Sequence, residues 1–276
     1  MRDLARDFRL LTSPLRLVPD FAIVGEAKCG TTSLYRYLLQ SPAVLGADRK
    51  EPKNFIDYPD SLFYCRSHYP TRAARRMRRM RLGRRVVAGE ATAEYFSHPG
   101  MAKRLSRLLP RIKIVVLLRN PVDRAYSDYQ MLSRLGVTDL SFDEVVDRSL
   151  EWLETPALSD LVDAALRSEH FYLRFVARGL YARTLRQWFD VLPAYRILVL
   201  RSEDLFERPA DVVADVCRFL EVEPFVVRDA TPRRAGSYDS DMGNEPRRRL
   251  EDFYRPYNRE LYALVNRNMN WEVEAQ

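Results

Sequence analysis

A short apolar run followed by a glycine-rich loop constrains the fold of this chain more than any other feature. Residues 21–24 (FAIV) predict a buried strand. The loop 25–32 (GEAKCGTT) follows directly, and the leucines and tyrosines of residues 32–40 recur at helical spacing. The loop therefore joins a strand to the N-terminus of a helix, where backbone N–H groups and the helix dipole favour an anion.

A second strand–helix unit begins about 90 residues further along the chain. Residues 114–118 (IVVLL) indicate a central parallel strand that is buried on both faces. Asn120 suits a helix N-cap and Pro121 suits the first helical position, and Gly136 suits the C-terminal stop. A similar unit should therefore lie here, with a helix that ends at about residue 135.

Further strands and helices alternate along the rest of the chain. We expect a strand at 196–200 and helices at 172–192, 209–220 and 245–265. Such alternation predicts an α/β fold, a single domain with a central parallel sheet flanked by helices. We assign residues 20–276 to this domain and residues 1–19 to an N-terminal extension.

The glycine loop departs from a nucleotide phosphate-binding loop at one position. P-loop NTPases carry G-x-x-x-x-G-K-[ST]. Gly25, Gly30 and Thr32 match this pattern, but Thr31 occupies the lysine position and Lys28 comes two residues before the second glycine. A P-loop-type kinase is therefore one alternative, weakened by this change and because no acidic residue directly follows the strand at 114–118.

Composition permits a globular enzyme and argues against several other classes. Of the 276 residues, 46% are apolar, which is enough for a sizeable core. No apolar run reaches the about 18 residues of a transmembrane helix, and the charged N-terminus does not resemble a secretory signal, so we expect a cytoplasmic protein. Three scattered histidines predict no metal site, and three widely spaced cysteines predict no disulfide framework.

The positive charge of the chain is concentrated in one segment. The net charge is +7, with 45 basic and 38 acidic residues. Residues 71–85 hold eight arginines and no acid, so 37 basic residues face 38 acidic ones elsewhere. Ala73, Met77 and Met80 recur at helical spacing in this segment. It is interpreted either as a helix that docks an anionic polymer or membrane, or as a solvated helix face. A non-catalytic polyanion-binding module is thus a second alternative function.

The loop motifs, taken together, resemble those of sulfotransferases that use 3′-phosphoadenosine-5′-phosphosulfate (PAPS). PDFAIVGEAKCGTTSLYRYL is similar to the 5′-phosphosulfate loop of that family, and KIVVLLRNPVDRAYSDY to its 3′-phosphate-binding strand and helix. The resemblance extends over residues 20–272 through KEPKNF, GEATAEYF, ARGLYARTLRQWF, RILVLRSEDL and DFYRPYNRELYAL. It is closest to the heparan-sulfate sulfotransferase branch and its bacterial relatives.

This resemblance implies a fold, a reaction and a set of partners. The fold would be P-loop-like, and the reaction would move the sulfuryl group of PAPS to an acceptor hydroxyl, leaving adenosine 3′,5′-bisphosphate (PAP). The acceptor would be a small molecule or glycan, including an anionic one, and we expect a carbohydrate or glycolipid. No metal and no nucleic-acid partner is implied. The sequence does not predict the oligomeric state.

The resemblance also assigns the residues that bind PAPS. Lys28 would stabilise the oxygen that bridges sulfur and phosphorus as charge develops on it. Arg119 offers a guanidinium fork that matches the 3′-phosphate, with a strand-end salt bridge as the alternative. Ser127 would join Arg119, with a merely solvent-facing serine as the alternative. Thr32 would bind the 5′-phosphate, cap the helix, or both. The full set of expected PAPS-binding residues is Lys28, Cys29, Gly30, Thr31, Thr32, Ser33, Arg119, Ser127, Arg233, Arg234 and Gly236, the last three in a basic loop that matches the family loosely.

The segment KEPKNF supplies the expected catalytic base. Glu51 occupies the position of the family's glutamate, and Lys50 and Lys53 on either side would favour its ionised carboxylate. The alternative is a surface Glu–Lys pair, in which case Asp57 and Glu90 are the next carboxylates to consider. Related chains often read KEPHFF and GEKTPSYF. This chain lacks that histidine and has Ala91 in place of the lysine, which argues against heparan sulfate itself as the acceptor.

Overall fold

The structure is a computed structural model that describes residues 4–153, 172–231 and 242–272. By its internal contacts the chain divides into two compact units. One, called here the sheet unit, comprises Met1–Glu26, Gly30–Leu117 and Trp188–Arg233. The other, called the helical unit, comprises Ala27–Cys29, Leu118–Gln187 and Arg234–Gln276.

One five-stranded sheet forms the centre of the sheet unit. Its strands, in spatial order, are β2 (Val44–Gly46), β3 (Val87–Ala91), β1 (Phe21–Gly25), β4 (Lys113–Leu118) and β5 (Ile197–Arg201). Strand β1 pairs in parallel with both β3 and β4, and β2 pairs in parallel with β3. The α/β fold with a parallel sheet and flanking helices is therefore confirmed, and so are the three predicted strands. Strands β2 and β3 were not expected from the sequence.

Gly25 ends β1 where the neighbouring strand comes closest. A Cβ atom at this position would lie 2.2 Å from the carbonyl oxygen of Leu117 in β4. The φ angle of Gly25 is also +145°, in the region that side chains rarely adopt. The first glycine of the loop is therefore required by the packing of the two central strands.

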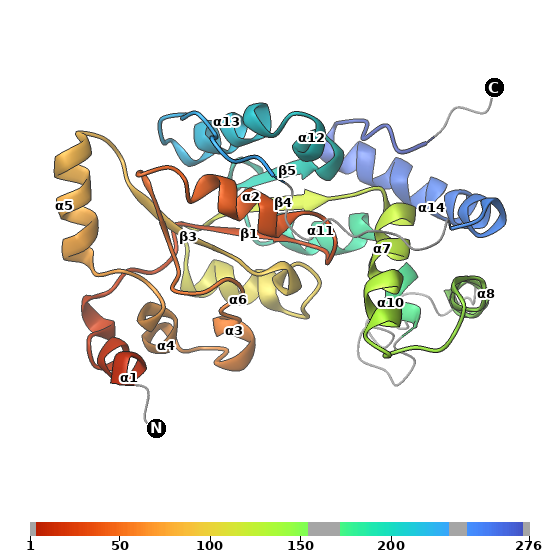
Figure 1. Ribbon diagram of the computed structural model, residues 1–276, viewed down its shortest axis with the longest axis horizontal. Helices are drawn as coiled ribbons and strands as arrows, with labels where there is room; N and C mark the ends of the chain where they lie inside the picture. The colour runs from red at the N-terminus through yellow and green to blue at the C-terminus, as the bar shows by residue number, and fades with distance from the viewer. Residues whose placement is uncertain (1–3, 154–171, 232–241, 273–276) are drawn as a thin grey trace. The chain divides into compact units, whose positions relative to one another are not determined.

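Helices cover both faces of this sheet. Helices α2 and α13 contact each other and the strands β1 and β5 on one face, and α6 lies on the other (Figure 1). Strand β1 is completely buried between them. The helical elements of the sheet unit are α1 (Leu4–Leu11), η1 (Ser13–Leu15), α2 (Thr31–Leu38), α3 (Asn54–Asp57), α4 (Leu62–Ser67), α5 (Arg72–Leu82), η2 (Ala93–Tyr95), α6 (Met101–Leu108), η3 (Ala194–Arg196), α12 (Ser202–Glu207) and α13 (Pro209–Leu220).

The helical unit is built around a separate apolar core. Its helices are α7 (Pro121–Arg134), α8 (Phe142–Leu153), α10 (Leu173–Ala177), most of α11 (Tyr181–Phe189) and α14 (Asn244–Val265). Side chains such as Tyr126, Val146, Val176 and Tyr254 pack together in this core. As predicted, α7 ends just before Gly136, whose φ angle is +66°.

One predicted helix proves to be two. The sequence favours a continuous helix over residues 172–192, whereas the structure has α10 and α11 separated by Arg178, Gly179 and Leu180. A Cβ atom on Gly179 would lie 2.6 Å from the ring of Tyr254 in α14. The break therefore accompanies close packing of the backbone against that tyrosine, which a local pattern does not reveal.

No helix in the described part of the chain is both long and apolar enough to cross a membrane.

Candidate functional site

The glycine loop leads from β1 into α2 through two residues in left-handed conformations. Lys28 has a φ angle of +74°, which is uncommon for a residue with a side chain, and Gly30 has +86°. Helix α2 begins at Thr31, and Gly30 is its N-cap without any side-chain capping bond. The interpretation of Thr32 as the helix cap is therefore wrong, because the cap position falls two residues earlier.

The first turn of α2 presents unused hydrogen-bond donors. The backbone N–H groups of Thr31 and Thr32 donate to no other described residue, as expected for the first positions of a helix. Thr31 and Ser33 are buried, Thr32 is half-buried, and the Cys29 thiol is completely buried. An anion placed here would find backbone donors and the positive end of the helix dipole.

Lys28 and Arg119 belong to the same unit and contact each other through the backbone. The Nη1 atom of Arg119 donates to the carbonyl oxygen of Lys28 over 3.4 Å. The carbonyl of Arg119 accepts a 2.9 Å bond from the Tyr181 hydroxyl. The Lys28 ammonium lies 3.8 Å from the sulfur of Met131, a weak contact. The structure thus places the guanidinium of Arg119 beside the backbone of Lys28.

Helix α7 places Ser127 in a buried position. The Asn120 side chain caps this helix by accepting from the Val122 N–H over 2.9 Å, as predicted. Ser127 is only 3% exposed, so the interpretation as a solvent-facing serine is wrong. Its hydroxyl has no hydrogen-bond partner among the described residues. Beside it, Arg124 and Asp128 form a fully buried ion pair, with 3.4 Å between Nη1 and Oδ2.

The loop that carries Glu51 is anchored to β3 and is also strained. The Glu51 N–H donates to the carbonyl of Ala91 over 3.1 Å. Glu51 and Lys53 have φ angles of +52° and +50°. Lys50 forms an ion pair with Glu51, as expected. Lys53 does not: it pairs with Glu94, and that hydrogen bond raises the pKa of Lys53. Lys50 is therefore the lysine that pairs directly with Glu51, while Lys53 attracts Glu51 without a direct ion pair.

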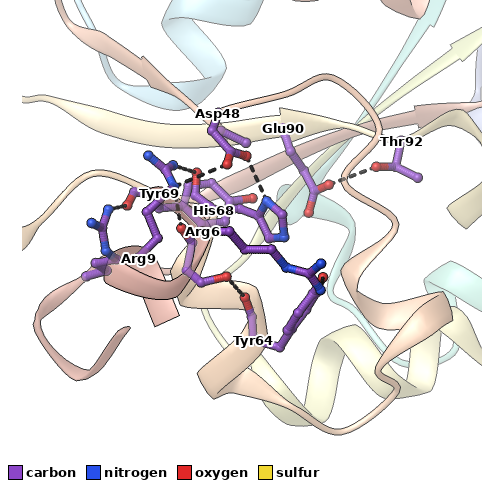
Figure 2. Close-up of polar contacts among 12 residues, drawn as sticks. Arg6, Arg9, Asp48, Tyr64, His68, Tyr69, Glu90 and Thr92 are labelled. Atoms are coloured by element: carbon purple, nitrogen blue, oxygen red, sulfur yellow. Dashed lines mark hydrogen bonds and ion pairs between the residues drawn. The ribbon is translucent and has the colours of Figure 1, made fainter. Parts of the chain in front are cut away.

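Glu90 is the second carboxylate of interest in the sheet unit. It lies in β3 and is buried, and its Oε2 atom accepts a 2.8 Å bond from the Thr92 hydroxyl (Figure 2). Burial raises the pKa of Glu90 to about 7, and hydrogen bonds from Thr92 and Tyr69 oppose that shift. By contrast, Asp57 is exposed.

The positions where this chain departs from the family pattern are mostly buried. Asn54 and Ala91 are completely buried. Neither the amide nitrogen nor the amide oxygen of Asn54 has a partner among the described residues. Lys53 is half-buried and held by Glu94. These departures therefore alter the packing behind the Glu51 loop more than they alter its surface.

Sequence reasoning missed a basic cavity in the sheet unit. A cavity of about 560 Å³ is lined by residues of α1, of α4 and of the loop after β2: Ala5, Arg6, Arg9, Asp48, Arg49, Tyr64, Ser67 and His68. Asp48 accepts from His68 Nδ1 over 2.7 Å and pairs with Arg9 over 3.2 Å (Figure 2). No local sequence pattern predicts this cavity, because the residues that line it come from three separate segments of the sequence. None of the predicted site residues lines it.

Three predicted PAPS-binding residues, Arg233, Arg234 and Gly236, lie outside the described residues.

Comparison with known proteins shows the family to which this chain belongs. The sequence profile of the sulfotransferase domain matches residues 18–231. A crystal structure of a sulfotransferase from Alicyclobacillus acidocaldarius is 32% identical, covers 92% of this chain and 99% of that chain, and superposes with a TM-score of 0.69.

Two curated proteins are also similar over most of this chain. The membrane-associated sulfotransferase kil1 of Dictyostelium discoideum is 25% identical over 94% of this chain and 67% of its own length. The human bifunctional heparan sulfate N-deacetylase/N-sulfotransferase 2 is 27% identical over 91% of this chain but only 30% of its own length. This chain thus corresponds to a part of that larger protein, and it belongs to the sulfotransferase domain family.

Proposed function

We propose that this protein transfers the sulfuryl group of PAPS to a hydroxyl group of a carbohydrate acceptor. The observation that carries the proposal is the loop between β1 and α2. It ends in a helix N-terminus with unused N–H donors, and it holds the charged residue Lys28 in a strained conformation. Strain of this kind concentrates at functional sites, and this loop lacks the lysine that would reach a triphosphate.

The donor residues have separate tasks in this proposal. The N–H groups and hydroxyls of Thr31 and Thr32 bind the 5′-phosphate. Arg119 and the unpaired hydroxyl of Ser127 bind the 3′-phosphate. The acceptor oxygen attacks sulfur, and the bond between sulfur and the bridging oxygen breaks, so that PAP departs with an additional negative charge. Lys28 stabilises that charge, an effect that is commonly the largest single contribution in transfer reactions.

A carboxylate must take the proton that the acceptor hydroxyl loses. Glu51 is the better base because it is partly exposed and its ion pair with Lys50 holds the carboxylate in place. Glu90 is the second choice. Its raised pKa suits a base near neutral pH, but its carboxyl is buried against Thr92 and Tyr69.

The names of the relatives support the class of acceptor, and no single acceptor molecule is proposed. One relative is named for heparan sulfate, which supports a carbohydrate acceptor, and a glycolipid would present the same hydroxyl groups. We propose residues 20–276 as one sulfotransferase domain and residues 1–19 as an N-terminal extension. A cytoplasmic location and the absence of a required metal stay predictions.

Calorimetry tests the donor assignment against the kinase alternative. PAP should bind at least about tenfold more tightly than ADP, because Arg119 and Ser127 recognise the 3′-phosphate that ADP lacks. Arg119→Lys should remove most of this preference while leaving ADP affinity nearly unchanged, since lysine has no bidentate fork. Equal affinity for PAP and ATP, or binding that requires magnesium, would overturn the sulfotransferase assignment in favour of a kinase.

A further inference from the structure

Helix α5 is an exposed helix with an unusual distribution of charge. Thr71 caps its start by accepting from the Ala74 N–H, and Gly83 ends it in a left-handed conformation. The helix holds six arginines and no acid, and none of its residues is buried. Isolated helices of this length are marginal in water, so contacts along one side must hold it in place.

The inner side of α5 is fixed by two arginines. Arg75 pairs with Asp20 over 2.8 Å, just before β1. Arg78 donates to the carbonyl of Pro42 over 3.2 Å. These contacts tie the helix to the sheet unit through polar groups and leave its apolar residues unused.

The outer side of α5 combines a basic stripe with an apolar stripe. Arg72, Arg76 and Arg79 recur at helical spacing and are exposed, and their side chains form no ion pair or hydrogen bond with any described residue. Beside them, the stripe predicted from the sequence faces solvent instead of the core, and Met77 and Met80 are each 66% exposed. The side of the helix that would normally be purely polar is therefore amphipathic.

A second helix at this end of the sheet unit also exposes apolar side chains. Leu4, Phe8 and Leu11 lie on one face of α1 and are 78%, 61% and 81% exposed. On another side of α1, Arg9 donates to the carbonyls of Ser67 and His68, so α1 is attached through a basic side chain.

The two helices are connected through the backbone of the sheet unit. Arg16 forms an isolated antiparallel bridge with Thr71, the cap of α5, and the Leu17 N–H donates to the carbonyl of Pro70. Leu15 and Phe63, which lie next to α1, are a further 65% and 52% exposed. Figure 1 shows α1 and α5 at the same end of this unit.

We propose that α1 and α5 form a docking surface for an anionic lipid membrane. Interfacial helices combine basic side chains, which are attracted to acidic headgroups, with apolar side chains that enter the acyl boundary. The exposed leucine, phenylalanine and methionine side chains favour a lipid over a sulfated or phosphorylated polymer, which would engage the arginines alone. The unpaired arginines favour a lipid over a second copy of this chain, because two copies would bring like charges together. The proposal does not depend on the catalytic function.

Vesicle sedimentation tests this surface with the full chain. The protein should bind phosphatidylcholine vesicles that contain phosphatidylserine, and bind pure phosphatidylcholine much more weakly. The triple variant R72Q/R76Q/R79Q should reduce partitioning to acidic vesicles by about 100-fold at low salt, at about fivefold per arginine. The matched control R218Q/R248Q/R255Q removes three exposed arginines elsewhere and should retain most of the binding.

Apolar variants separate a lipid from the competing partners. M77S/M80S and L4S/F8S/L11S should each weaken the vesicle binding that persists at high salt, with far-UV circular dichroism unchanged. Retention on heparin without vesicle binding would overturn the proposal and assign the arginines to an anionic polymer. A concentration-dependent dimer that M77S/M80S abolishes, without vesicle binding, would overturn it in favour of a self-association surface. Vesicle binding that the arginine variant leaves unchanged would also overturn it.

Discussion

The loop around Lys28 and the loop around Glu51 share an unusual backbone conformation but differ in the groups that surround it. Each holds a charged residue in a left-handed conformation that such residues rarely adopt, with φ angles of +74° and +52°. Lys28 precedes a helix with unused N–H donors, whereas Glu51 is tied by its own N–H to β3 and by its carboxylate to Lys50. The first loop therefore presents groups that suit an anion, and the second holds a carboxylate in a direct ion pair.

Because the two loops share a strained backbone but differ in their contacts, strained backbone alone does not define a chemical role. We expect the surroundings of each loop to set its role: N–H donors and cations for one, and a direct ion pair with Lys50 for the other. The following predictions test whether the two loops act on different steps, in order of decreasing effect.

Replacing Glu51 tests the proton-accepting role of the second loop. Glu51→Gln keeps the shape of the side chain and removes the base, so turnover should fall by about 10²–10⁴-fold while PAP affinity is retained. Turnover is measured with labelled PAPS and a sulfatable acceptor, and affinity by calorimetry.

The matched control for Glu51→Gln is Glu94→Gln, which removes another lysine-paired carboxylate that serves the same loop. It should change turnover only a few-fold. If Glu51→Gln is nearly as active as the parent protein and Glu90→Gln is not, the base is Glu90. The proton would then be accepted by a residue of β3, and not by the loop around Glu51.

Replacing Lys28 tests the charge-stabilising role of the first loop. Lys28→Ala should lower turnover by about 10²–10³-fold, because the departing oxygen loses its cation. Unlike Glu51→Gln, it should also weaken PAPS binding and slow the background hydrolysis of PAPS by water. The three quantities are measured in one buffer for both variants.

Lys103→Ala, which removes an exposed lysine of α6, is the control for Lys28→Ala and should leave all three quantities unchanged. Wild-type PAPS hydrolysis in Lys28→Ala would contradict the assignment of Lys28 to the leaving group.

Glu90 allows a test that does not depend on turnover. Because burial raises its pKa from 4.5 to about 7, the folded protein keeps a proton that the unfolded chain releases. This group therefore contributes most stability below its unfolded pKa, and that contribution is lost as the pH rises to about 7. Glu90→Gln stays neutral and should lack this loss, so its stability relative to the parent should rise by up to about 3 kcal/mol between about pH 4.5 and pH 8.

Urea denaturation of the parent and Glu90→Gln across this pH range measures the difference. Parallel stability curves would show that the pKa of Glu90 is not raised in the folded protein, and would remove the argument that favours Glu90 as a base near neutral pH.

The elements that sequence analysis predicted correctly are those with strong local signals. The runs at β1, β4 and β5 are continuously apolar, α5 has apolar residues at helical spacing, and α7 carries a recognisable N-cap and a glycine at its end. Strand β3 was missed because its sequence, VAGEA, is poor in β-branched residues. It is a strand because it pairs with β1 and β2, and local sequence does not reveal that pairing.

The candidate site was only partly accessible to the same reasoning. The motif positions identify Lys28, Glu51, Arg119 and Ser127, and their roles stay predictions. Local sequence could not predict that Lys53 pairs with Glu94, because that partner depends on how two distant loops pack. Nor could it predict the outward direction of Met77 and Met80, because a helical period fixes which residues share a face but not which face meets the core.

The left-handed residues also bear on how this sequence can change over time. Among the described residues, Glu221 and Asn266 adopt such angles as helix C-caps, a common use of that conformation. At Lys28 and Glu51, glycine would relieve about 1 kcal/mol of backbone strain each and would erase the charged groups. Selection for thermal robustness alone would therefore favour glycine at these two positions, so the proposed activity requires that selection for the charged side chains outweigh this strain.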